Sequence, residues 1–252
     1  MRVPLGLWYP GLDGVLFSST SKHLTSLSAR RYLSSYSGVH IIGAFKQTMP
    51  NIIAAIKRKW TTRIAGARKR MWDKLYASGF GYQLSLPGEQ EHNQTLVDFM
   101  VSAKKNQTIL EVGCGEGLLL DYLDRWGYQK YVGIDFSDVA LRNASKRANS
   151  KTTFISGLAE SFVPDGQFDA IVFNESLYYF DDPMQVIRRY ERYLTPDGVM
   201  LVSLFTKTER IKLLAAEISK GFRVMRKASV TNGADTWECF MLGRAGGKRN
   251  EG

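Results

Sequence analysis

The sequence predicts an α/β protein whose doubly wound, mostly parallel sheet of seven strands ends in an antiparallel hairpin. Short apolar runs alternate with helical patterns from about residue 89 onward, which is typical of parallel strands with helices on both faces. A glycine-rich turn directly follows the first apolar run. Two extended runs close the pattern, joined by a turn sequence that favours a hairpin. A basic N-terminal extension precedes this fold.

The extension accounts for the whole positive charge of the chain. Residues 1–70 hold 12 Lys/Arg and one acid, a net charge of +11, whereas the remaining residues hold 22 Lys/Arg and 23 Asp/Glu, a net charge of −1. Nucleic acid is therefore not an expected partner of the folded body. Residues 1–48 are rich in Ser and Arg, which suits a mobile arm or an organelle-import segment. We predict a cytoplasmic protein and keep import as the alternative.

Residues 49–88 are expected to form an amphipathic helix followed by an aromatic cover segment. Pro50 suits the first turn of a helix, and Gly79 suits its end. Apolar residues recur between them at helical spacing, opposite a basic face. We expect the helix to dock on its own domain, and contact with an anionic membrane surface is the alternative. The aromatic residues of 71–82, Trp72 among them, could close over a ligand.

Residues 89–244 contain the alternating elements, and residues 245–252 are expected to be a flexible tail. The expected strands are 108–112, 131–135, 153–156, 169–174, 199–205, 222–230 and 236–242. Helices are expected at 89–105, through Leu119, Leu123 and Trp126, through Leu141, Ala144 and Ala148, from Met184 to Leu194, and from Ile211 to Ile218.

The residue types do not predict a metal site or a disulfide framework. Cys114 and Cys239 are too few for either and suit buried, reduced thiols. The histidines His23, His40 and His92 are scattered, and no carboxylate cluster has metal-ligand spacing. No apolar run is long enough to span a membrane as a helix.

The turn at 111–117 carries the strongest chemical signal. Gly113, Gly115 and Gly117 let the backbone turn tightly and approach a ligand. A dinucleotide site requires glycine where Leu118 stands, which disfavours an oxidoreductase. Glu111, at the end of the preceding strand, suits a cationic amino group instead.

A second acid ends the next expected strand. Asp135 can accept hydrogen bonds from both hydroxyls of a ribose, and Phe136 is available to stack on an adenine. Dinucleotide sites share this feature, so it supports a nucleoside ligand without identifying the cofactor.

Four motifs in register resemble the class I S-adenosylmethionine-dependent methyltransferases over about residues 71–244. They are Ile109–Gly117, Val132–Asp135, Phe168–Asn174 and Leu194–Val202. The resemblance implies S-adenosyl-L-methionine as cofactor, with the three glycines around its methionine part, Glu111 at the ammonium and Asp135 at the ribose. It also places Asn174 beside the sulfonium and Ala159, with Glu160, at the adenine. Many relatives have an aspartate where Leu158 stands, so the adenine contact differs here.

The acceptor is expected to be a small molecule methylated at oxygen or nitrogen. Tyr178 could line its pocket, and Glu175 and His92 are the candidate general bases. An RNA or protein methyltransferase that holds its substrate with the basic N-terminal segment is one alternative. A non-catalytic membrane-surface protein of the same fold is another. The oligomeric state stays open.

Overall fold

The computed structural model describes residues 66–85, 90–105, 107–233 and 235–244. These residues belong to one compact unit, which extends from Arg63 to Gly252. Much of the expected helix at 49–88 and the whole 1–48 arm lie outside the described residues, as does the 245–252 tail. Residues 66–77 are helical, as predicted for that part. Among the described residues, no helix is both long and apolar enough to cross a membrane.

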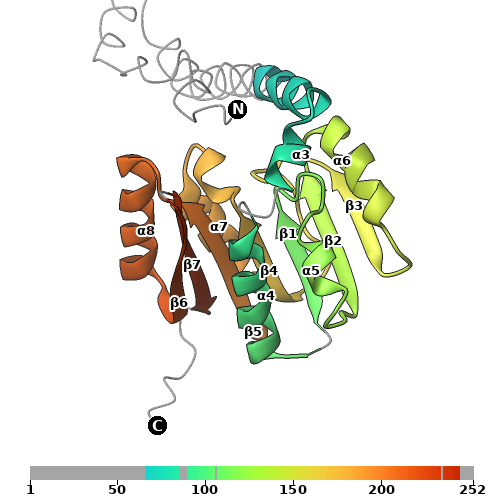
Figure 1. Ribbon diagram of the computed structural model, residues 1–252. Helices are drawn as coiled ribbons and strands as arrows, with labels where there is room; N and C mark the ends of the chain where they lie inside the picture. The colour runs from blue at the N-terminus through green and yellow to red at the C-terminus, as the bar shows by residue number, and fades with distance from the viewer. Residues whose placement is uncertain (1–65, 86–89, 106, 234, 245–252) are drawn as a thin grey trace, which may run out of the picture. The chain divides into compact units, whose positions relative to one another are not determined.

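Seven strands form one sheet in the described part of the chain, as the sequence predicted (Figure 1). Its order is β3-β2-β1-β4-β5-β7-β6. All neighbours pair in parallel except β7, which is antiparallel to both β5 and β6. The strands are β1 (Thr108–Val112), β2 (Lys130–Asp135), β3 (Thr152–Ser156), β4 (Phe168–Asn174), β5 (Leu194–Phe205), β6 (Arg223–Asn232) and β7 (Asp235–Gly243).

The helices between the strands are mostly short. They are α3 (Phe80–Leu84), α4 (Glu91–Ala103), α5 (Leu120–Leu123), α6 (Asp138–Ala144), α7 (Pro183–Glu191) and α8 (Glu209–Gly221), with 3₁₀ turns η4 (Ser145–Arg147) and η5 (Leu177–Tyr179). Two of them begin at side-chain caps. Ser137 accepts a hydrogen bond from the N–H of Ala140, and Asp182 accepts one from Gln185.

Two helix ends differ from the sequence expectation. α5 ends at Leu123 rather than at Trp126, because the chain turns at Gly127, which has a left-handed φ of 74°. Leu194 was expected to end a helix, but it begins β5 and pairs with Phe168. The N–H of Phe168 donates to the carbonyl of Tyr193, which fixes this pairing as soon as α7 has ended.

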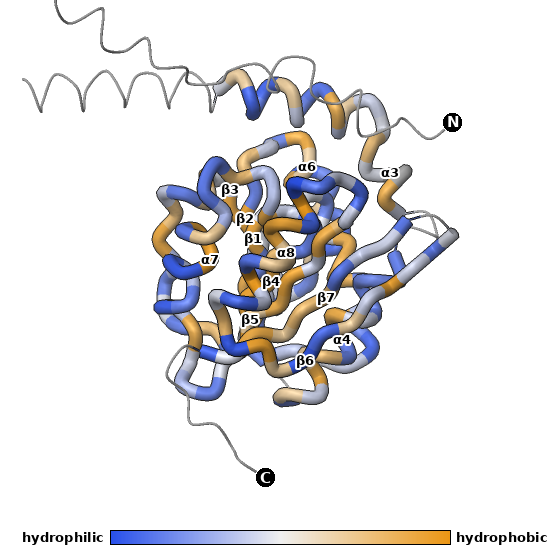
Figure 2. Tube along the Cα trace, turned by 90° about the vertical axis from the view of Figure 1, so that its left-hand side faces the viewer, coloured by the Kyte–Doolittle hydropathy of each residue, from blue (hydrophilic) through white to orange (hydrophobic). Residues whose placement is uncertain are grey.

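Apolar side chains cover both faces of the sheet. One cluster joins the strands to α7 and α8 through residues such as Val186, Ile187, Leu214 and Ile218. The second joins the other face to α4 and α5 through residues such as Leu96, Met100, Leu119 and Leu123. In Figure 2 the strands inside the sheet are mostly coloured as hydrophobic. The burial of both faces explains why the central strands read as nearly continuous apolar runs.

The strand order reverses between β1 and β4. β1 pairs with β2 on one side and with β4 on the other, so the connections leave in opposite directions. In open α/β sheets, a ligand binds at the carboxyl ends of the strands at such a switch point. A ligand site is therefore expected among the residues at the carboxyl ends of β1, β2 and β4.

Candidate functional site

The glycine turn after β1 has no room for side chains. Gly113, Gly115 and Gly117 have φ values of 76°, 51° and 70°, in the left-handed region that favours glycine. A Cβ on Gly113 would lie 2.6 Å from the Cβ of Ser176, and one on Gly115 would lie 2.6 Å from the hydroxyl of Tyr76. The turn therefore requires glycine on both conformational and steric grounds.

Asp135, at the end of β2, is tied to this turn. Its Oδ2 accepts a 2.9 Å hydrogen bond from the N–H of Gly115, and its Oδ1 accepts a 2.8 Å bond from the N–H of Ser137. Burial raises the pKa of the carboxyl, and the hydrogen bonds from backbone N–H groups oppose that rise. The carboxylate lies buried where the ends of β1 and β2 meet.

Glu111 lies in β1 and is buried beside the turn, with 2% of its surface exposed. The hydroxyl of Tyr131 donates to its Oε2, and Asn174 also hydrogen-bonds with it. Burial raises the pKa of Glu111 from its ordinary value of 4.5 to about 8. A cation bound beside it would favour its ionised form.

Asn174 ends β4 and is the centre of a polar network. Its Nδ2 donates to the Oδ1 of Asn93 over 2.7 Å, and its Oδ1 accepts a 2.7 Å bond from the hydroxyl of Ser203. It also hydrogen-bonds with His92. Asn174 therefore links α4 to the ends of β4 and β5, beside Glu111.

Glu175 follows with a φ of 53°, the one non-glycine residue with positive φ in the described part of the chain. Its N–H donates to Ser203 over 3.0 Å. Its Oε2 accepts a 3.0 Å bond from the hydroxyl of Tyr178 and a 3.2 Å bond from Nε1–H of Trp237. Strained backbone of this kind clusters at functional sites.

His92 packs beside this polar network. Its ring stacks on that of Trp237 at 5.3 Å between centroids and 14° between planes. Burial lowers its pKa to about 4, so the imidazole is neutral near pH 7. Its Nδ1 is buried and has no hydrogen-bond partner among the described residues. The structure thus brings two of the predicted catalytic candidates, His92 and Glu175, against the indole of Trp237, and the third, Tyr178, donates to Glu175.

The 66–77 helix covers this part of the sheet. Trp72 contacts Tyr179 edge to face, with 4.9 Å between ring centroids, and it also packs near Tyr76 and Phe80. Tyr76 is buried against Gly115. The predicted aromatic cover therefore lies between the glycine turn and η5.

Side chains of α7 hydrogen-bond with the backbone of the predicted adenine contact, Ala159. Arg189 and Tyr190 both donate to the carbonyl of Ala159, over 2.7 and 2.9 Å. The Oε1 of Glu160 lies 3.5 Å from a guanidinium nitrogen of Arg68 in the cover helix. Phe136 is half-buried after β2. The contacts that these residues make with a ligand stay predictions.

Sequence reasoning missed several members of the site. Ser203 and Asn93 hold Asn174, Trp237 and Tyr131 hold the two glutamates, and Ser176 closes on Gly113. Each is an unremarkable residue of a strand or helix pattern, so no local signal identifies it. Among the described residues, no group of three or more His, Cys, Asp or Glu is arranged to hold a metal ion.

A cavity of about 120 Å³ lies elsewhere, at the opposite edge of the sheet. It is lined by residues around the start of β1 and the end of α5, including Gln107, Ile109 and Trp126. None of the site residues lines it, so it has no part in the chemistry described above.

The family model of a methyltransferase domain matches residues 88–239. This range includes every strand end that forms the site, and the cover helix at 66–77 precedes it. The chain belongs to this methyltransferase family. With the seven-stranded sheet and the glycine turn, it is a class I S-adenosylmethionine-dependent methyltransferase.

Curated relatives of this methyltransferase include proteins with different acceptors. A ribosomal protein L11 methyltransferase of Caulobacter sp. is 28% identical over 152 residues, covering 58% of this chain and 51% of the relative. A ubiquinone biosynthesis O-methyltransferase of Albidiferax ferrireducens is 33% identical over 115 residues, covering 43% and 45%. The chain thus spans about half the length of such relatives.

Solved structures share the fold of this methyltransferase at low identity. The N-methyltransferase NodS of Bradyrhizobium japonicum, in complex with S-adenosyl-L-homocysteine, aligns with a TM-score of 0.54 and 18% identity, covering 64% of this chain and 91% of NodS. A methyltransferase of Aquifex aeolicus aligns with the same TM-score and identity, covering 65% and 96%.

The site of this methyltransferase fits the cofactor that its family implies. The glycine turn adopts left-handed φ values that favour glycine and lies at the strand ends where the sheet order reverses, and a buried carboxylate stands at the ends of both β1 and β2. One acid suits an ammonium group and the other a ribose. Gly113, Gly115 and Gly117 would hold the cofactor together with Glu111 and Asp135.

Proposed function

We propose that the protein transfers a methyl group from S-adenosylmethionine to an oxygen or nitrogen of a small-molecule acceptor. The observation that carries this proposal is the arrangement of Glu175 and neutral His92 around the indole of Trp237, beside Asn174. Both side chains can accept a proton or a hydrogen bond from a hydroxyl or an amine. Aromatic rings around them suit a flat or apolar acceptor.

When bound, the cofactor supplies a methyl group on a sulfonium that carries its own leaving group. The residues of this chain then have to orient the acceptor, exclude water and receive its proton. Glu175 is the better placed to receive it, because Tyr178 and Trp237 hold its carboxylate in one orientation. His92, with a pKa of about 4, is suited to accept a hydrogen bond and to orient the acceptor.

The cover over the site also favours a small acceptor. Trp72 packs against both Tyr76 and Tyr179 at the carboxyl ends of the strands. A relative from Dictyostelium discoideum, named as a mitochondrial ubiquinone biosynthesis O-methyltransferase, is 31% identical over 114 residues, in line with this proposal.

The experiment is a methyl-transfer screen of the full chain with labelled S-adenosylmethionine and separate pools of phenols, amines and carboxylic acids. We expect label in at least one pool. Glu175→Gln should lower kcat roughly a hundredfold or more, the usual scale of a lost general base. Glu217→Gln, an exposed position on α8, is the matched control. Transfer to no pool, in a preparation that binds the cofactor, would refute a small-molecule acceptor.

A second candidate is a protein acceptor, which the match to the L11 methyltransferase favours. The same assay, offered ribosomal proteins or RNA in place of small molecules, distinguishes it. Methylation of a protein that falls as the salt concentration rises would support the alternative in which the basic residues 1–70 hold the substrate. Binding to anionic vesicles without any cofactor binding would support the non-catalytic alternative.

We also infer a cytoplasmic location, with import through residues 1–48 as the alternative. Fluorescent fusions of the full chain at its C-terminus test it. A signal confined to an organelle, and shortening of the chain there, would favour import.

A further inference from the structure

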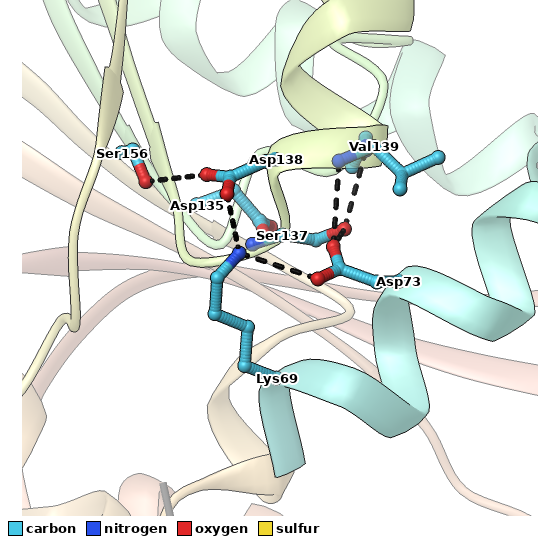
Figure 3. Close-up of polar contacts among 8 residues, drawn as sticks. Lys69, Asp73, Asp135, Ser137, Asp138, Val139 and Ser156 are labelled. Atoms are coloured by element: carbon cyan, nitrogen blue, oxygen red, sulfur yellow. Dashed lines mark hydrogen bonds and ion pairs between the residues drawn. The ribbon is translucent and has the colours of Figure 1, made fainter. Parts of the chain in front are cut away.

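The cover helix at 66–77 is attached to the sheet by charged side chains as well as by rings. Arg68 contacts Asp181 at 2.7 Å and Glu160 at 3.5 Å, on the loops that flank β4. Lys69, the next residue, and Asp73, one turn after Lys69, point to the start of α6 (Figure 3). The helix thus contacts loops on both sides of the candidate site.

Lys69, Asp73, Ser137, Asp138 and Ser156 form what we term the Lys69 cluster (Figure 3). The Nζ of Lys69 lies 2.9 Å from Oδ2 of Asp138 and 3.3 Å from Oδ2 of Asp73. The hydroxyl of Ser137 donates to Oδ1 of Asp73 over 2.7 Å, and that of Ser156 donates to Asp138 over 2.9 Å. The cluster joins the cover helix, α6 and β3.

Ser137 connects this cluster to Asp135. Its N–H donates to Oδ1 of Asp135 over 2.8 Å, while its hydroxyl donates to Asp73 and accepts from the N–H of Ala140. The backbone N–H and the hydroxyl of Ser137 are therefore both hydrogen-bonded, and the residue is fully buried. A shift of Asp73 would move Ser137 and, with it, the carboxylate of Asp135.

Lys69 acts on Asp135 through its charge. Burial raises the pKa of Asp135, and the nearby positive charge of Lys69 opposes that rise, together with backbone N–H groups. Lys69 is a partly buried cation facing three acids, Asp73, Asp135 and Asp138. Its removal would leave these acids to repel one another.

We propose that Lys69 and Asp73 are positioning residues for the cofactor, which hold the Asp135 carboxylate in the place and charge state that binds the ribose hydroxyls. The inference rests on the proposed ribose contact of Asp135. In this proposal the helix at 66–77 is part of the cofactor site and contributes to cofactor affinity through the Lys69 cluster.

The test is calorimetric titration of the full chain with S-adenosylhomocysteine, and with an analogue that lacks both ribose hydroxyls. We expect Lys69→Met and Asp73→Ala to weaken binding of the natural product about tenfold, the scale of one lost charge-assisted interaction. Lys69→Arg should restore most of the affinity. Lys74→Met, the same exchange at an exposed position of the same helix, should leave it unchanged.

The analogue separates positioning from a merely structural role. If Lys69 acts through the hydrogen bonds of Asp135 with the ribose hydroxyls, Lys69→Met leaves binding of the analogue unchanged. An equal loss for both ligands, or no loss for either, overturns the proposal. Asp135→Ala tells the two hypotheses apart. If Asp135→Ala weakens binding and Lys69→Met does not, the positioning role alone fails, whereas no effect of Asp135→Ala removes the ribose contact itself.

Discussion

Replacement of Glu111 by glutamine tests the electrostatics of the site most directly. Glu111 is buried, and its pKa is raised from 4.5 to about 8 in the folded protein. The folded state therefore holds a proton that the unfolded chain releases above pH 4.5. Stability from the neutral carboxyl is fully present below pH 4.5 and is lost as the pH rises toward 8.

The size of this effect follows from the two pKa values. Each unit of difference corresponds to about 1.4 kcal/mol, so the loss is about 3 kcal/mol at pH 7 and about 5 kcal/mol above pH 8. Glutamine has the same shape, can still accept the hydrogen bond from Tyr131 and never ionises. We expect the Glu111→Gln variant to gain stability over the native protein by about 1.4 kcal/mol per pH unit between pH 5 and 8.

Urea unfolding of both proteins at a series of pH values measures this gain. The same exchange at exposed Glu91 reports the effect of removing one surface charge. A constant difference between Glu111→Gln and the native protein across pH 5–8 would refute the reasoning. The variant should also bind S-adenosylmethionine more weakly, because the proposed ammonium contact needs a carboxylate. A gain in stability with a loss of binding is typical of residues kept for function.

The remaining predictions concern the glycine turn and the thiols. Gly113→Ala should destabilise the fold by about 3 kcal/mol, because strain at positive φ adds to a 2.6 Å clash with Ser176, whereas Gly79→Ala, at positive φ in open space, should cost only about 1 kcal/mol. Urea unfolding checks both, and equal losses would contradict the steric argument. Burial raises the pKa of Cys239 to about 12 and that of Cys114 well above its usual range, so neither thiol should react with a disulfide reagent at pH 8 before unfolding. A thiol that titrates in the native protein would contradict this.

The alternation of strands and helices, the terminal hairpin and the glycine turn could all be predicted from the sequence. Each depends on a local pattern: apolar runs that a buried strand requires, or glycines at left-handed φ. Asp135 and Asn174 could be placed at the same edge because the carboxyl ends of parallel strands meet there. The ends of helices were less predictable, as Leu194 shows, because strand pairing with Phe168 outweighs helical spacing.

Only the tertiary structure decided which side chains meet. Trp237 and Glu175 are 62 residues apart, and Asp73 and Ser137 are 64 apart, so no spacing in the sequence relates them. The pKa values of Glu111 and His92 likewise depend on burial by distant elements. Local patterns determine the elements and the glycine turn, whereas packing between distant segments decides the charge and orientation of the residues around that turn.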